Sequence, residues 1–136
     1  MMRTVFVDAN VFLRFFTAGD MVQQRRAADL LHKAAAGKVA LVTGPPVLFE
    51  IAWTLRSAYR LGCENVLDVL DAIVATPGLT LLDSNLVEDA VRVARNSGQE
   101  FADAYIIVSA RKVGADAIAT FNRKHFEPMG ANLYRF

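Results

Sequence analysis

Four short apolar runs recur along the chain, separated by longer segments with helical spacing. The runs cover residues 5–7, 39–42, 79–82 and 117–119, and turn or capping residues bound each of them. An uninterrupted apolar run of this length is typical of a strand that is buried on both faces. We therefore expect a central sheet of four to five strands.

The longer segments carry start and stop signals of helices. Asp20 can cap a helix over residues 21–36, and Pro45 and Pro46 open a helix that continues to about residue 59. Strands that alternate with helices indicate βαβ units with right-handed crossovers, and hence a parallel sheet. The prediction is a single α/β domain over residues 1–136, with its parallel sheet flanked by helices. Further helices are expected over residues 65–76, 85–96 and 102–113.

The composition of the chain also predicts an apolar interface with a partner. A chain of 136 residues is one ordinary domain. Hydrophobic residues make up 54% of it and the mean hydropathy is +0.27, more than its own core needs. Residues 11–16 hold more large apolar side chains than one helix face can bury. We therefore expect an apolar contact with a second subunit or another partner.

Charge and cysteine content exclude several classes of protein. The longest uncharged stretches, residues 39–49 and 72–82, fall well short of the roughly 20 residues that span a bilayer. No membrane segment is predicted, and a cytoplasmic location is expected. The single cysteine, Cys63, excludes an internal disulfide. The net charge of +1 lacks the basic excess of a protein held on nucleic acid by electrostatics alone, so any such contact is local.

The first candidate for chemistry is an acid at the end of the first apolar run. Asp8 follows this run directly, and Asn10 comes two residues later. An acid in this place lies at the carboxyl edge of the sheet, where open α/β folds bind ligands. Both side chains can then supply an oxygen ligand to a cation. Capping of the next helix, residues 11–16, explains Asp8 equally well.

Two further acids lie on separate predicted helices. Asp103 is in the first turn of its helix, where the helix dipole already favours a negative charge. It also shares a stripe with Ile106 and Ile107, so it is partly desolvated and needs a cation. Glu50 interrupts an apolar stretch, and a solvated helix flank explains it equally well. Three acids on separate elements favour Mg²⁺ or Mn²⁺ over zinc.

The last candidate region follows the fourth predicted strand and therefore lies at the same sheet edge. Thr120 and Asn122 can hold a metal-bound water or a phosphate, and Arg123 and Lys124 can contact a nucleic-acid backbone. A basic turn is more often simply solvated, so this cluster is weak evidence alone. His125 is interpreted as a loop residue rather than a general base.

Four short segments in this order resemble the PIN-domain nucleases, and most closely the VapC-type toxins of toxin–antitoxin pairs. The resemblance covers nearly the whole chain and implies a PIN-like fold. It also implies a Mg²⁺- or Mn²⁺-dependent endoribonuclease that cuts tRNA, rRNA or mRNA, forms a homodimer and is inhibited by a small antitoxin. The segments are Val7-Asp8-Ala9-Asn10, Pro46-Val47-Leu48-Phe49-Glu50, Asp103-Ala104-Tyr105-Ile106-Ile107 and Ala119-Thr120-Phe121-Asn122.

By position, the resemblance assigns Asp8, Glu50 and Asp103 to the family's first three acids, and Asn10 to a polar residue that accompanies the first. A fourth acid is common after the last core strand, where this chain has Asn122. An amide can coordinate a cation but adds no charge, so a second metal ion would be held less firmly.

Two other functions stay open. The first is a PIN-like domain that binds RNA or a protein but is too poor in charge to cut, which the amide of Asn122 supports. The second is a phosphoaspartyl phosphatase with Asp8 as the nucleophile. Such enzymes usually carry a second acid two residues later, where this chain has Asn10.

Overall fold

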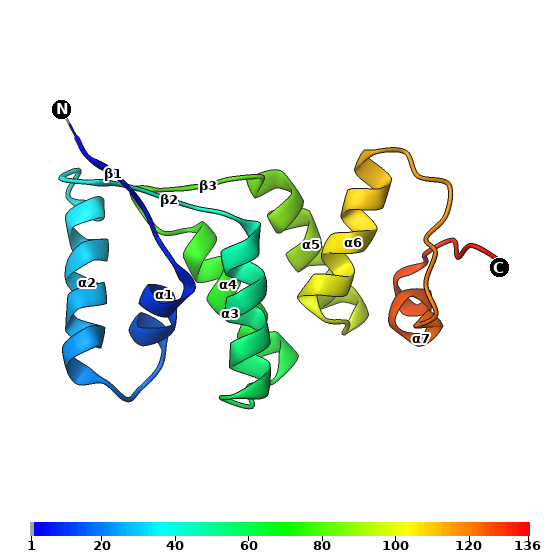
Figure 1. Cartoon of the computed structure of the whole chain (residues 1–136), viewed down its shortest axis with the longest axis horizontal. Helices are drawn as coiled ribbons and strands as arrows, with labels where there is room; N and C mark the ends of the chain where they lie inside the picture. The colour runs from blue at the N-terminus through cyan, green and yellow to red at the C-terminus, as the bar shows by residue number, and fades with distance from the viewer. Residues whose placement is uncertain (1) are drawn as a thin grey trace.

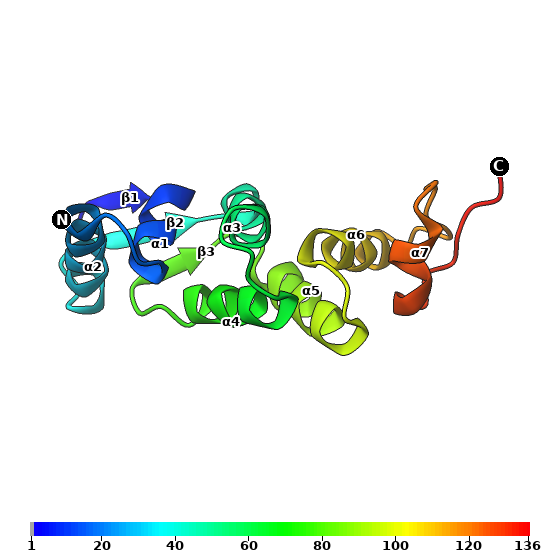
Figure 2. The same cartoon turned by 90° about the horizontal axis from the view of Figure 1, so that it is seen from below.

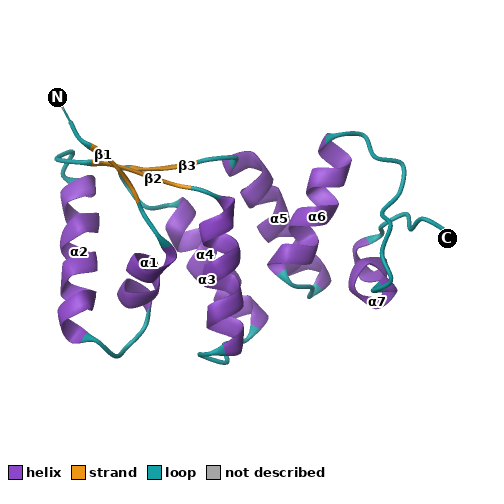
Figure 3. Cartoon of the chain, viewed as in Figure 1, coloured by secondary structure: helices purple, strands orange, loops and turns teal. Residues whose placement is uncertain are grey.

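The structure is a computed structural model that describes residues 2–136. Its sheet has three parallel strands in the order β1-β2-β3 (Figure 1, Figure 3). β1 is Thr4–Phe6, β2 is Ala40–Thr43 and β3 is Leu79–Leu81. Thr4 lies opposite Ala40, and Leu41 lies opposite Leu79. The α/β class and the parallel sheet predicted from the sequence are therefore confirmed.

Local signals place the starts of two helices, at residues 21 and 45, where the sequence predicted them. The Asp20 carboxylate accepts a hydrogen bond from the Gln23 amide at 2.9 Å and so caps a helix. Pro45 occupies the first turn of the next helix, where its missing N–H leaves no bond unmade. The helices are α1 (Ala9–Phe16), α2 (Met21–Ala35), α3 (Pro45–Ser57), α4 (Cys63–Val74), α5 (Ser84–Ser97), α6 (Phe101–Lys112), α7 (Arg123–Phe126) and the short 3₁₀ helix η1 (Glu127–Met129).

The core lies beneath β2, the central strand. Leu41 of β2 and Leu48 and Ile51 of α3 are fully buried. Thr43 is the one buried polar residue of the described chain, and its hydroxyl donates to the Val7 carbonyl oxygen at 2.9 Å. This bond ties the carboxyl ends of β1 and β2 together, next to Asp8.

One tight turn needs a glycine. Gly78 precedes β3 with φ of +80°, a backbone region that residues with a side chain avoid. A Cβ atom at this position would lie 2.4 Å from the carbonyl oxygen of Ala34, at the end of α2. The turn and the close packing of α2 on the start of β3 therefore exclude any other residue.

The molecule is elongated, with the sheet and the C-terminal helix at opposite ends. α1 to α4 all lie on the same side of the sheet, and α5, α6 and α7 follow one another away from it (Figure 1, Figure 2). α6 packs mainly on α5, and α5 packs on α4. No helix of residues 2–136 is both long and apolar enough to cross a membrane.

The prediction of four to five strands is wrong for this chain, because the sheet has three. Residues 117–119 do not join it, and Ile118 forms only an isolated parallel bridge with Leu133. α6 docks on α5 and α3, so residues 117–119, which follow α6, lie far from β1. A strand pattern is therefore present without a neighbour in the sheet.

Candidate functional site

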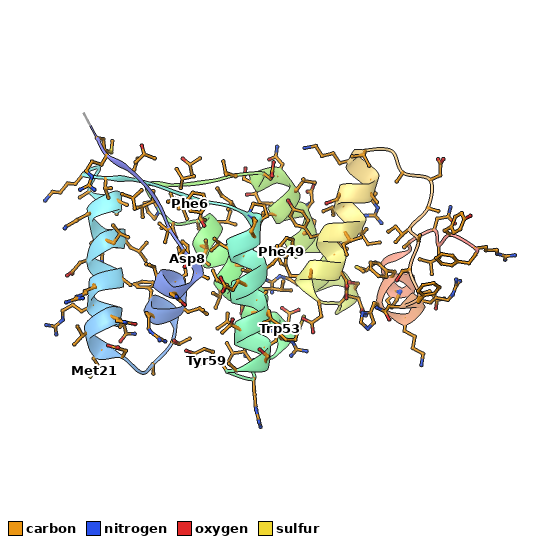
Figure 4. The ribbon with its side chains drawn as sticks, in the orientation of Figure 1. Phe6, Asp8, Met21, Phe49, Trp53 and Tyr59 are labelled. Atoms are coloured by element: carbon orange, nitrogen blue, oxygen red, sulfur yellow. The ribbon has the colours of Figure 1, made fainter. Side chains whose placement is uncertain are left out.

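Asp8 lies at the turn from β1 into α1 (Figure 4). It occupies the N-cap position, with φ of −84° and ψ of 164°, but its side chain makes no capping hydrogen bond. Its carbonyl oxygen alone accepts from the Val11 amide, at 3.2 Å. The side chain is exposed. Capping therefore does not account for the carboxylate, which remains available for a ligand.

Asn10 lies on the wall of a cavity of about 330 Å³ between α1 and α2. Arg14 and Arg26 line the same cavity, and the Arg14 Nε donates to the Gln23 side-chain oxygen at 2.7 Å. Two guanidinium groups in one hollow attract an anion, and phosphate is an anion that arginine recognises well. The sequence did not predict this cavity, because the cavity depends on how α2 packs on α1.

Glu50 lies on the exposed flank of α3. The opposite face of this helix buries Leu48 and Ile51 in the core. Trp53, one turn further along, is 72% exposed, and Figure 4 shows it on the same helix as Phe49. Glu50 therefore lies on a solvated helix flank, one of the two explanations that the sequence left open. The exposed tryptophan beside it offers a surface that a nucleotide base or a partner can contact.

Asp103 is the most enclosed of the three acids. It lies in the first turn of α6, and 19% of its side chain is exposed. His125 of α7 approaches it, with 3.2 Å between Nδ1 and the Oδ2 of Asp103. His125 was interpreted from the sequence as a loop residue, and this contact was missed. The sequence carried no signal for it, because the two residues meet only through the docking of α7 on α6.

An aromatic cluster fixes the start of α6 against α3. The ring centroids of Phe49 and Phe101 are 5.4 Å apart, and those of Phe49 and Tyr105 are 5.0 Å apart. Burial raises the pKa of Tyr105, and the nearby Asp83 raises it further. The ring therefore stays neutral and contributes apolar contact beside Asp103.

An ion pair at the other end of this contact strengthens it. Arg56, near the end of α3, pairs with Glu100 at 2.8 Å and also donates to the Leu61 carbonyl at 3.0 Å. The hydrogen bond and the charge of Glu100 raise the pKa of Arg56. The start of α6, and with it Asp103, is thereby held at the side of α3.

The region after residue 119 forms a turn that opens α7. The backbone N–H of Asn122 donates to the Thr120 hydroxyl oxygen at 3.0 Å, and the Asn122 side chain is exposed. Arg123 lies 3.4 Å from Glu127 in an exposed pair. Lys124 is exposed, and no ion pair is found for it among the described residues. These side chains can meet a ligand from solvent.

A single chain does not bring the acids together into a metal centre. Among residues 2–136, no group of three or more His, Cys, Asp or Glu side chains is placed to hold a metal ion. Asp8, Glu50 and Asp103 have the oxygen donors that Mg²⁺ and Mn²⁺ prefer, but this arrangement does not fit such an ion. A cavity of about 630 Å³ between α5 and α6 is lined by none of the predicted site residues.

Comparison with known proteins assigns the family. Among solved structures, the chain is similar to VapC20 of Mycobacterium tuberculosis, described as a sarcin–ricin loop cleaving toxin. The two are 22% identical over 97% of this chain and 99% of that one, with a TM-score of 0.41, too low for details to be transferred. A search of curated proteins found no match. The PIN domain model matches residues 5–130. Because this match spans nearly the whole chain, the protein belongs to the PIN domain family.

Proposed function

We propose that this protein is a Mg²⁺- or Mn²⁺-dependent endoribonuclease, the toxin of a VapBC-type pair that acts in the cytoplasm. The observation that carries the proposal is the Asp8 carboxylate, which has no capping role and lies at the carboxyl end of β1 in a PIN-family chain. A charged side chain without a structural partner, at the sheet edge where α/β folds bind ligands, indicates chemistry.

The proposed chemistry explains why acids are needed. Hydrolysis of a phosphodiester places negative charge on the phosphate oxygens, and a divalent ion held by carboxylates would offset this charge. Asp8, Glu50 and Asp103 would hold such an ion once they are brought together, with Asn10 and Thr120 in support. Asn122 has the place of a fourth acid and can orient a water through its amide. His125 positions the Asp103 carboxylate from 3.2 Å.

Basic and aromatic side chains support RNA as the substrate. Arg14 and Arg26 line the cavity beside Asn10, and Lys124 is exposed after the last apolar run. Phosphate contacts by such residues hold an RNA backbone in place without reading its sequence. The exposed Trp53 suits stacking on an unpaired base, or coverage by an antitoxin. The cognate antitoxin and a second copy of the chain are the proposed protein partners.

A binding function without cleavage is the second candidate. Asn122 replaces an acid, and residues 2–136 contain no group of three acids placed for a metal. A crevice with so little charge can still bind RNA or a protein. Cleavage by the wild type that stops in a chelator would exclude this candidate.

The deciding experiment measures cleavage of total tRNA and rRNA by the purified chain in Mg²⁺, Mn²⁺ or EDTA. Asp103→Asn is prepared in parallel, with Asp116→Asn as the matched control because Asp116 is an exposed acid outside the proposed site. We expect Asp103→Asn to lower the cleavage rate at least about 100-fold. The control should cut like the wild type.

Stability is measured on the same samples. Asparagine has the size of aspartate and its side-chain oxygen can still accept a hydrogen bond from His125, so Asp103→Asn should unfold at nearly the same urea concentration as the wild type. An unfolded Asp103→Asn would assign this acid to the fold. Equal cutting by both variants and the wild type would contradict the proposed site.

A further inference from the structure

β1 has an open edge. It pairs only with β2 among the described strands. The Arg3 carbonyl accepts from Ala40 at 2.9 Å, and the Val7 amide donates to Val42 at 2.8 Å. Because the backbone groups of a strand point alternately to its two sides, those of Thr4 and Phe6 point away from β2. Phe6 is also 59% exposed. Such an edge is a template for another strand.

Residues 117–119 form an isolated bridge with residues 132–134 and, among the described residues, lack a partner on the other side. Ile118 donates to the Asn132 carbonyl and accepts from the Tyr134 amide, both at 2.8 Å, so its backbone groups face residues 132–134. The backbone groups of Ala117 and Ala119 therefore face the other way, and no backbone hydrogen bond is found for them in the described chain. The bridge at Ile118 is parallel, like the sheet.

The chain cannot join these two edges to each other without breaking its own contacts. α3 lies between β1 and α6 in both views (Figure 1, Figure 2). α6 is held there by the Phe49–Phe101 contact and by the Arg56–Glu100 ion pair. Residues 117–119 follow α6 and lie beyond it, away from β1. A second copy of the chain can reach β1 with all of these contacts intact.

The surface area supports a second copy. The chain exposes 8332 Å², whereas a compact monomer of 14.9 kDa exposes about 7,000 Å². The excess, roughly 1,300 Å², exceeds the roughly 800 Å² that each partner buries in an ordinary stable interface. Exposed aromatic residues on both parts, Phe6 and Phe121, contribute to this excess.

We propose that two copies exchange these segments, so that residues 117–119 of each pair in parallel with β1 of the other. The exchange is reciprocal, so it closes into a two-fold dimer. Parallel strands end at the same sheet edge, so Asp8 and Asn10 of one copy meet Asn122 and Asp103 of the other. This composite active site rests on the proposed nuclease function, whereas the strand exchange does not.

Cross-linking tests the exchange independently of activity. Two chains with different tags, both Cys63→Ser, carry Thr4→Cys and Ala119→Cys respectively and are refolded together. A short bis-maleimide is expected to link them into a heterodimer. The matched control replaces Thr4→Cys by Thr80→Cys, on the far edge strand β3, and should give at most background. Equal yields from the two pairs would overturn the exchange.

Two measurements separate the remaining arrangements. One chain that carries both Thr4→Cys and Ala119→Cys should give linked dimers, and a link within a monomer would overturn the proposal. Light scattering of the wild type should give a dimer. A wild type that stays monomeric at concentrations where it is folded would overturn the proposal as well.

Complementation tests the composite site. Asp8→Asn and Asp103→Asn are each expected to be inactive, but a mixture refolded at equal amounts should regain about a quarter of the wild-type rate, because half of its dimers have one intact site. A mixture as inactive as its parts, beside an active wild type, would overturn the composite site. If the wild type itself does not cut, the nuclease function fails, and the cross-links still decide the exchange.

Discussion

The sheet region and the C-terminal segment contain similar apolar runs but bury them differently. In the sheet region, Leu41 of β2 is fully enclosed by strands on both sides and helices beneath. In residues 113–136, only Phe126 and Met129 are buried. Phe121 and Phe136 stack on each other with their ring centroids 4.6 Å apart, yet 86% and 75% of them are exposed. An apolar run becomes a core strand only where neighbours cover it.

The sharpest test of this difference is a matched pair of truncations. Leu41→Ala should lower the free energy of unfolding by about 3 kcal/mol, because it leaves a cavity in a fully packed site. Ile118→Ala removes a half-buried side chain and should lower it by about 1 kcal/mol. Urea denaturation followed by circular dichroism measures both. Equal losses would show that residues 117–119 are as well packed as the sheet.

The same pair distinguishes the monomer from an exchanged dimer. If residues 117–119 pair with a second copy, the effect of Ile118→Ala should grow with protein concentration, because dimers are stabilised by mass action. The stability loss caused by Leu41→Ala should depend less on protein concentration, because Leu41 is packed within its own chain.

These particular residues show what the sequence could predict. The cap at Asp20 and the proline start of α3 follow from local rules, and the structure has both. The prediction of a fourth strand failed, because whether residues 117–119 pair with the sheet depends on where α6 docks. No local sequence pattern encodes that position. The candidate site shows the same division. The position of Asp8 directly after β1 could be predicted from the sequence, but the contact of His125 with Asp103 arises from tertiary packing alone.

A medium effect is expected where α5 joins the sheet region. Arg95 of α5 pairs with Asp71 at 2.7 Å and Asp68 at 3.2 Å, and it also contacts Glu64, all on α4. Arg95→Ala should lower the free energy of unfolding by about 1 kcal/mol, because a network of several charges exceeds a single exposed pair. High salt should reduce this loss.

The control for this network is Arg92→Ala. Within the part of the chain that the structure describes, Arg92 pairs only with Asp89, at 2.7 Å on its own helix, and both side chains are mostly exposed. Its loss should amount to roughly 0.3 kcal/mol. Arg95→Ala with no larger effect than Arg92→Ala would show that the link between α4 and α5 rests on apolar packing alone.

The smallest effect concerns Cys63, at the start of α4. Burial raises the pKa of its thiol, and the thiol donates to the Gln99 carbonyl at 3.3 Å. As the pH rises, the unfolded chain therefore loses this proton first, and the free energy of unfolding falls. Between about pH 8 and about pH 10, the wild type should lose slightly more stability than Cys63→Ala. Denaturation in a reducing agent measures this, and parallel curves would contradict it.

Trp53 has a practical consequence for all of these measurements. It is the single tryptophan of the chain, and its indole is largely in contact with water in the folded state. Unfolding therefore changes its surroundings little, and its intrinsic fluorescence is a poor signal for the denaturation curves. The same indole lies one turn from Glu50 on α3, so an RNA or an antitoxin that covers this flank should shift its emission to shorter wavelength. The chain thus contains its own optical reporter of occupancy, which needs no label.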